Sequence, residues 1–137
     1  MEKEQYVSFE ISQLLKEKGF DWEVFTCCDE ISKFNRANTS YNWNNANFDV
    51  DVFSVPTQQM ACRWLREVHN IFIGVGIGED IDGEFGYMPF IHILDNLSCS
   101  DGRYVPHVDA DQICYSTPET YEEAVEIALG YCLTDLI

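Results

Sequence analysis

The amino-acid sequence predicts an α+β fold, in which an antiparallel sheet of three to five strands carries about three helices packed mainly on one face. One reason is that segments of helical apolar spacing alternate along the chain with segments in which every second residue is apolar. Another is that no repeat or linker divides the 137 residues, of which 46% are hydrophobic. Residues 1–137 are therefore expected to form one domain in the order helix, two strands, helix, two or three strands, helix.

The first predicted helix, FEISQLLKEKG, begins after Ser8, whose hydroxyl suits an N-cap. Gly19 suits the left-handed C-terminal stop. Two strands are then expected, WEVFTCC at residues 22–28 and FDVDVF at residues 48–53. Residues 35–47 between them contain six asparagines, which favour turns over a regular element. Trp43 in this segment is expected to be either an exposed anchor or a lid over the core.

The second helix is predicted at residues 56–70, PTQQMACRWLREVHN, because its apolar side chains fall within one arc. A strand follows at residues 71–78, then an acidic turn at Asp82-Gly83 and a returning strand. Pro89 in the returning strand cannot donate to a ladder, so an edge or a bulge is expected there. The first of these strands has glycine at positions 74, 76 and 78. That face is therefore expected either to receive a closely packed helix or to be open to a ligand.

The last predicted helix follows Thr120, which forms a capping-box pattern with Glu123. Residues 95–116 before it are polar and rich in turn-forming residues, with a short strand expected at residues 112–115. The core face of the helix is predicted to consist of Tyr121, Val125, Ala128, Cys132 and Leu136.

The glycine-rich stretch does not fit a phosphate or EF-hand calcium loop. A dinucleotide loop needs its third glycine where Glu79 stands, and a P-loop needs a lysine where Glu84 stands. An EF-hand centred on Gly83 needs a bidentate glutamate where Pro89 stands. These spacings favour a simple hairpin.

No catalytic residue, metal ligand set or cofactor is predicted, which favours a non-enzymatic protein without deciding the point. The candidate ligands contain no C-x-x-C and no helical H-x-x-x-H pair; they are His69, His92, His107, Asp109 and Asp111. Cys62 and His69 lie two helical turns, about 10 Å, apart and cannot form a dyad. Adjacent Cys27 and Cys28 are expected on opposite faces of their strand.

The net charge of −16 is concentrated in residues 79–137, where 13 acidic residues face a single base, Arg103. This disfavours direct binding to nucleic-acid phosphates, because affinity there comes from lysine and arginine. A basic partner is compatible with such a surface, and so is a surface that only keeps the protein in solution. The start MEKEQYVSFE does not resemble a secretory segment, and the longest apolar stretch, residues 71–78, is shorter than the ~20 residues of a membrane helix. A cytoplasmic protein with reduced thiols is therefore expected.

Three blocks, SFEISQLLKEKGF, PTQQMACRWLREVHNIFI and TYEEAVEIALGYCLTDLI, cover 49 of the 137 residues. In these blocks the chain resembles small uncharacterised proteins carried by phages and mobile elements of gut bacteria. The resemblance implies a bacterial cytosol and an accessory role during growth of the phage or element. It implies no catalytic residue and does not extend to residues 35–47 or 95–116.

The favoured function is protein–protein interaction between the acidic surface and a basic host or element protein, and imitation of nucleic acid is one form that this interaction could take. The expected partner-binding residues are Glu122, Glu123, Glu126, Ile127 and Tyr131. Ile127 and Tyr131 either form a docking patch beside the glutamates or tuck under residues 95–116. One alternative is a small-molecule binder or enzyme with a pocket near His92, His107 and Asp109. Another is a structural homodimer.

Overall fold

The computed structural model of the protein describes residues 5–29, 31, 34–45, 51–79, 82–94, 98–100, 103–105 and 118–137. Over these residues it confirms an α+β fold, with three α-helices and antiparallel β-strands. The strand predicted at residues 112–115 lies outside the described residues, as does the first half of the strand predicted at residues 48–53.

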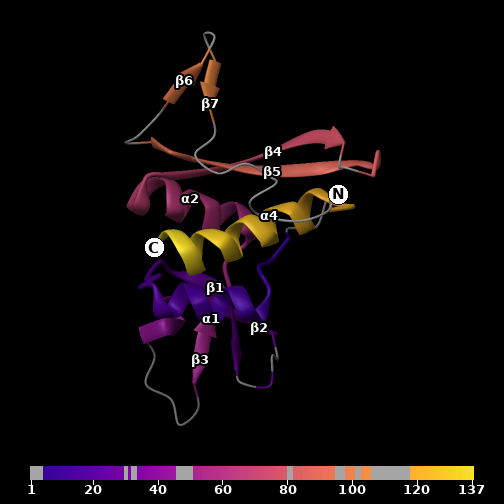
Figure 1. Ribbon diagram of the computed structural model, residues 1–137. Helices are drawn as coiled ribbons and strands as arrows, with labels where there is room; N and C mark the ends of the chain where they lie inside the picture. Colours follow the sequence, from indigo (N-terminus) through magenta and orange to yellow (C-terminus); the bar gives the residue numbers. More distant parts are fainter. Residues whose placement is uncertain are drawn as a thin grey trace.

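Three strands form a sheet in the lower part of Figure 1. They are β1 (Val24–Asp29), β2 (Phe34–Tyr41) and β3 (Val52–Ser54), in the antiparallel order β2-β1-β3. The middle strand, β1, buries Val24, Thr26 and Cys28, whereas Cys27 is only partly buried. Cys27 and Cys28 therefore point to opposite faces, as predicted.

Strand β2 corrects the expectation of turns across residues 35–47, because Phe34–Tyr41 is extended and pairs with β1. The low strand propensity of these residues is outweighed because β2 is an edge strand that hydrogen-bonds to β1. Its polar side chains can remain exposed to solvent in that position. The expected turn comes later, as a short 3-10 helix at Trp43–Asn45. There the Asn44 amide accepts from the Ser54 N–H at 2.8 Å and donates to the Phe20 carbonyl at 2.9 Å.

Trp43 is a lid over the core rather than an exposed anchor. Its indole Nε1–H donates to the Val24 carbonyl at 2.8 Å, and its ring packs against the core and, edge-on, against Tyr41. A tryptophan whose N–H is hydrogen-bonded inside the protein adds buried apolar area without leaving a donor unsatisfied.

The second sheet is the predicted hairpin of β4 (Ile71–Glu79) and β5 (Phe85–Ile93), in an uninterrupted antiparallel register. Gly83 has a φ of 82°, which confirms the turn. Tyr87 donates its N–H to the Pro118 carbonyl at 3.1 Å, so it points away from β4. Pro89, two residues further on, points the same way, and its missing N–H therefore removes no bond from the ladder. The prediction of an edge at Pro89 is confirmed.

A further pair of short strands, β6 (Ser98–Ser100) and β7 (Arg103–Val105), lies within residues 95–116. The sequence predicted no strand at these positions, because the segment is polar and rich in turn-forming residues.

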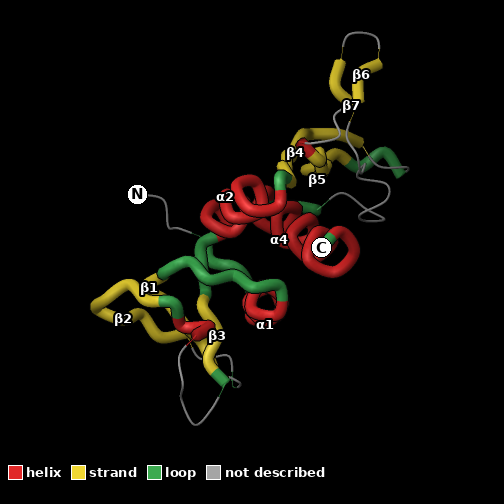
Figure 2. Tube along the Cα trace, turned by 90° about the vertical axis from the view of Figure 1, so that its left-hand side faces the viewer, coloured by secondary structure: helices red, strands yellow, loops and turns green. Residues whose placement is uncertain are grey.

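Two of the helices lie between the two larger sheets, and the first helix lies beside the lower sheet (Figures 1 and 2). Helices α2 (Gln58–His69) and α4 (Tyr121–Tyr131) contact the β4–β5 hairpin, while α1 (Phe9–Glu17) contacts β3 and α4. A π-helical segment, Cys132–Leu136, continues α4. The strands thus form separate sheets with helices between them, where the sequence suggested one sheet covered on one face.

This layering follows from the width of the apolar surface on α4. Its buried residues Ala124, Val125, Ala128 and Leu129 span about 140° of the helix circumference at 100° per residue, and the buried Cys132 and Leu133 continue that surface into the π-helical segment. The β4–β5 hairpin, α2 and α1 all contact α4, so more than one layer covers this surface. Tyr121, expected on the core face, is instead 52% exposed at the start of the helix.

The helix ends agree with the sequence. Ser8 accepts from the Ile11 N–H at 3.2 Å, and Gly19 has a φ of 90°. Thr120 accepts from the Glu123 N–H at 3.1 Å, while the Glu123 carboxylate reaches back to the Glu119 N–H at 3.3 Å. That bond lies one residue earlier than in a capping box, and it still places the carboxylate at the positive end of the helix dipole.

The glycine face of β4 is filled by side chains from its own partner strand. Gly74 lies opposite Phe90 and Gly76 opposite Met88 in the ladder. A Cβ atom at Gly74 would collide with the Phe90 ring, and one at Gly78 would collide with the Met88 side chain. The glycines therefore make room for cross-strand packing, so neither the closely packed helix nor the open ligand groove expected from the sequence is needed.

This packing predicts different costs for two neighbouring substitutions. Gly74→Ala should lower the free energy of unfolding by about 1–3 kcal/mol, because the new methyl group overpacks against the Phe90 ring. Gly76→Ala is the matched control, since its Cβ would meet Phe90 at an ordinary 3.9 Å, and should be neutral or slightly stabilising. Urea unfolding of the two variants checks this, and equal costs would contradict the described packing.

Candidate functional site: an acidic and aromatic groove

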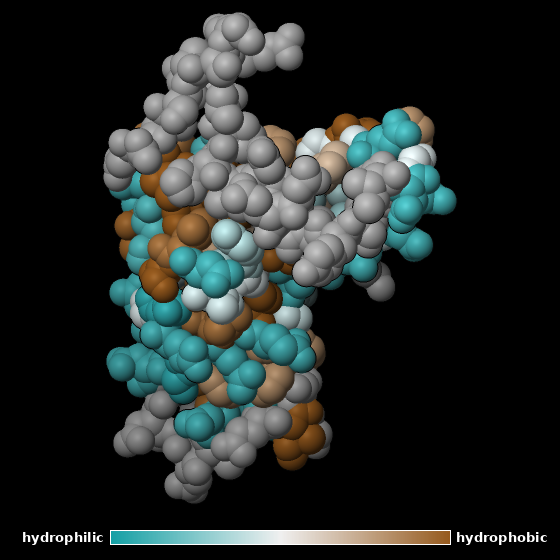
Figure 3. Space-filling view, viewed as in Figure 1, coloured by the Kyte–Doolittle hydropathy of each residue, from teal (hydrophilic) through white to brown (hydrophobic). Residues whose placement is uncertain are grey.

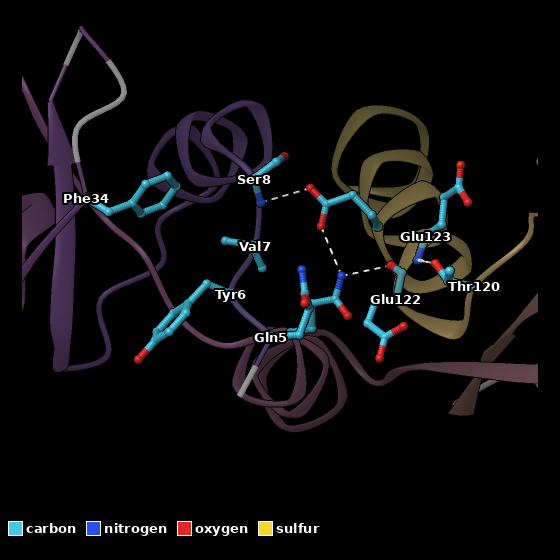
Figure 4. Close-up of a pocket in the computed structure, with 10 residues that line it drawn as sticks. Gln5, Tyr6, Val7, Ser8, Phe34, Thr120, Glu122 and Glu123 are labelled. Atoms are coloured by element: carbon cyan, nitrogen blue, oxygen red, sulfur yellow. Dashed lines mark hydrogen bonds between the residues drawn. The ribbon is translucent and has the colours of Figure 1, made fainter. Parts of the chain in front are cut away.

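A groove with a volume of about 790 Å³ lies where the N-terminal segment meets the starts of α2 and α4 (Figure 4). Its walls come from four parts of the chain that are far apart in sequence: residues 5–8, Phe34 of β2, Gln58 of α2, and the first turns of α4. The principal lining side chains are Tyr6, Phe34, Gln58, Glu122, Glu123 and Glu126.

The floor of the groove is held by backbone hydrogen bonds. Val7 donates its N–H to the Pro56 carbonyl at 3.1 Å, and Gln58 donates its N–H to the Gln5 carbonyl at 2.8 Å. Tyr6 and Thr57 form an isolated antiparallel bridge between them. This short pairing satisfies the first N–H of α2, which a helix cannot satisfy by itself, and it fixes the N-terminal segment alongside that helix.

Glu126 joins three segments at the back of the groove. Its Oε1 accepts from the Ser8 N–H at 2.9 Å, and its Oε2 accepts from the Gln58 side-chain amide at 3.2 Å. The same Gln58 Nε2 also donates to the Glu122 carbonyl at 2.9 Å. Figure 4 shows these bonds converging from α4 onto the N-terminal segment and α2. Glu126 is therefore occupied within the protein, in contrast to a freely exposed surface acid.

Glu122 and Glu123 form the acidic wall. Both are exposed on the first turn of α4. Glu123 accepts from the Glu119 N–H, and nothing within the described ranges hydrogen-bonds to the Glu122 carboxylate. Their negative charge is stabilised by the helix N-terminus and directed toward solvent at the mouth of the groove.

Tyr6 and Phe34 form an aromatic wall that lies across the groove from α4 (Figure 4). Phe34 is 51% exposed, and the Tyr6 hydroxyl accepts from Arg36 Nη1 at 3.1 Å. Exposed aromatic faces opposite carboxylates provide both elements that bind a lysine or arginine side chain, namely cation–π attraction and ion pairing.

The structure thus brings together three of the five residues predicted to bind a partner, Glu122, Glu123 and Glu126. Ile127 and Tyr131 are half-buried and do not line the groove, and Tyr131 packs against the core. Sequence reasoning missed Tyr6, Phe34 and Gln58. These residues are 24 or more positions apart, and no periodicity along one segment could have indicated that they meet.

The second predicted site is described only in part. His107 and Asp109 lie outside the described residues. His92 lies on the outer face of the hairpin, with its ring 5.5 Å from that of Phe90, and its Nδ1 is buried without a hydrogen-bond partner. In the part of the chain that the structure describes, no three His, Cys, Asp or Glu side chains are grouped closely enough to hold a metal ion.

Cys27, Cys28, Cys62 and Cys132 are free and sit in environments that suppress ionisation. Burial raises the pKa of the Cys28 and Cys62 thiols to about 11 and that of Cys132 to about 12. His69, which lies too far from Cys62 along the helix to form a dyad with it, has its ring centroid 4.7 Å from that of Trp64. These thiols are placed as core residues rather than as nucleophiles.

Comparison with known proteins finds no matching family model and no similar curated protein or solved structure. The described helices include none that is both long enough and apolar enough to cross a membrane. Fold and groove together define a small α+β protein with an open groove lined by acidic and aromatic side chains.

Glu126 and Glu122 are predicted to contribute differently to stability although both are acids on α4. Glu126→Ala should lower the free energy of unfolding by about 1.5–3 kcal/mol, because the Ser8 N–H and the Gln58 amide lose a charged acceptor. Glu122→Ala, the control, should cost below about 1 kcal/mol, the contribution of a helix-dipole interaction. Urea unfolding measures both values, and equal losses would rule out the joining role of Glu126.

The raised pKa values predict slow thiol chemistry in the folded protein. At pH 8 a thiol with a pKa of about 11 is ionised roughly a hundredfold less than one at 9.0, and only the thiolate reacts. Peptide mass spectrometry after iodoacetamide treatment should therefore show Cys28, Cys62 and Cys132 modified much faster in urea than in buffer. Equal rates in both conditions would show that these thiols are accessible and ionised in the fold.

Proposed function

We propose that this protein is a small acidic, non-enzymatic accessory protein that binds a basic host or element protein through the groove. The observation that carries the proposal is the pairing of an acidic wall, Glu122 and Glu123, with an aromatic wall, Tyr6 and Phe34, across one open cavity. A lysine or arginine side chain of the partner would place its charge between the carboxylates and its methylene groups against the rings.

Three features support a macromolecular partner over a small ligand. The groove is open rather than enclosed, it is built from four separate chain segments, and it belongs to a chain of net charge −16. Long-range attraction between such a chain and a basic protein speeds their encounter, and imitation of nucleic acid is one form this attraction takes. The phage or mobile-element setting rests on the resemblance of the three sequence blocks alone.

A defined cationic probe tests the proposal. An arginine-rich peptide should bind the protein at low salt and weaken as NaCl is raised, since exposed charges are screened. The double variant Glu122→Gln, Glu123→Gln should lose roughly tenfold in affinity, as expected for two ion pairs of up to about 1 kcal/mol each. Phe34→Ala should also weaken binding, by about threefold, through loss of a cation–π contact. Titration calorimetry measures all three.

The matched control removes two exposed acids from a different surface. Asp21 and Glu23 are exposed and do not line the groove, so Asp21→Asn, Glu23→Gln changes the net charge by the same amount. If this control weakens peptide binding as much as the groove variant does, attraction is a property of total charge and the groove has no specific role. A neutral peptide of the same length should not bind.

A further inference from the structure

The outer edge of β4 is a long strand edge that the described part of the chain leaves unpaired. β4 pairs with β5 along all nine of its residues, and no other described strand joins that sheet. The other edge of the hairpin, on β5, carries Pro89 and is met by Pro118, as described above. Within the described residues, the β5 edge of the hairpin thus has a backbone hydrogen-bond partner, whereas the β4 edge has no paired strand.

The orientation of the β4 backbone follows from two hydrogen bonds. Leu94 donates its N–H to the Asn70 carbonyl at 2.7 Å across the ladder, whereas Tyr87 donates away from it. Along an antiparallel pair, residues alternate between pointing their N–H and C=O groups toward the partner strand and pointing them away from it. The even-numbered residues of β4 and β5 therefore hydrogen-bond to each other. The N–H and C=O groups of Ile71, Ile73, Val75, Ile77 and Glu79 therefore point outward along the open edge.

Over residues 71–78 this edge lacks the features by which strand edges avoid pairing, and the one charged residue of β4, Glu79, is its last. Natural edges carry lysine, proline, a bulge or an inward-pointing charge. Residues 71–78 contain no charged residue and no proline, although the chain carries 24 acids, and their register with β5 is unbroken. Ile77 is also 80% exposed toward the free end of the hairpin, where Figure 3 shows hydrophobic beside hydrophilic residues.

We propose that β4 pairs with β4 of a second copy of this chain, giving a continuous four-stranded antiparallel sheet across a two-fold axis. In such a pair, the residues whose N–H and C=O groups point outward must lie opposite one another. The register in which all nine residues of β4 are paired places Val75 opposite Val75 of the other copy. Ile73 then lies opposite Ile77 of the other copy, on the same face as the core, and covers that exposed side chain. The contact is isologous and closed, so it yields a dimer rather than a filament.

The self-complementary register favours a second copy over an unrelated strand. Centred on Val75, it matches Val75 with Val75 and Ile73 with Ile77 on the inner face, and Gly74 with Gly76 and Phe72 with Gly78 on the outer face, while Glu79 meets Ile71 at each end. The net charge of −16 on each copy opposes association, and salt screens that repulsion. The dimer should therefore strengthen as NaCl rises, which is the opposite of the dependence expected for a basic partner in the groove.

Solution mass and crosslinking test the pairing. Analytical ultracentrifugation at moderate salt should give the mass of two chains, and Ile77→Lys should shift it to one. Phe85→Lys is the matched control, because Phe85 is 74% exposed but lies on β5, away from the proposed axis. Under mild oxidation Val75→Cys should form a 75–75 disulfide that peptide mass spectrometry identifies. Ile73→Cys should not, because its opposite residue is Ile77.

Each other result overturns the proposal. A single-chain mass at high protein concentration and moderate salt would show that the edge does not pair. A dimer that survives Ile77→Lys and lacks the 75–75 crosslink would place the contact on another surface. A single chain that instead captures an added apolar strand peptide would make β4 a docking edge for another protein. None of these outcomes depends on whether the groove binds a cationic peptide.

Discussion

The wide apolar surface of α4 is the constraint on which the rest of the structure depends. Ala128, Leu129, Cys132 and Leu133 are all fully buried, and the helix contacts α1, α2 and the β4–β5 hairpin. Because these elements contact it from more than one side, α4 lies inside the fold rather than on the outside of a single sheet. The separate sheets, the position of α1 and the placement of both proposed surfaces follow from the need to cover it.

Glu126 connects this core to the surface chemistry of the groove. On a helix whose inner side is apolar, it lies at the boundary and accepts bonds from segments that begin two other helices. The groove thereby has a rigid back wall, while Glu122 and Glu123, one turn nearer the helix start, keep their charges toward solvent. Glutamates on one helix thus differ in role because Glu126 is partly buried, whereas Glu122 and Glu123 are exposed to solvent.

The two proposed surfaces use opposite physics. The groove offers charge and aromatic faces to a cationic side chain, whereas the β4 edge offers uncharged backbone groups to a strand. They lie on different elements, since the groove is formed by residues 5–8, Phe34, Gln58 and the start of α4, and the edge belongs to the hairpin alone. Both kinds of contact are therefore compatible in one molecule, and ionic strength shifts the balance between them.

The sequence by itself determined the local elements. The caps at Ser8 and Thr120, the stop at Gly19, the turn at Gly83 and the edge character at Pro89 all follow from the chemistry of one residue and its neighbours. The three helices were predictable for the same reason. The acids Glu122 and Glu123 were also predictable as surface groups, because they begin an amphipathic helix.

Only the tertiary structure decided how these elements pair and which side chains meet. Strand β2 forms because β1 supplies its ladder, which outweighs the asparagines of that segment. Two glycines of β4 make room for side chains of β5 because the hairpin register places Gly74 opposite Phe90 and Gly78 diagonally across from Met88. Tyr6, Phe34 and Gln58 line one groove, and Glu126 connects segments of the fold through hydrogen bonds to residues 68 and 118 positions away. Such long-range contacts depend on the packing of whole elements, which local pattern and propensity do not encode.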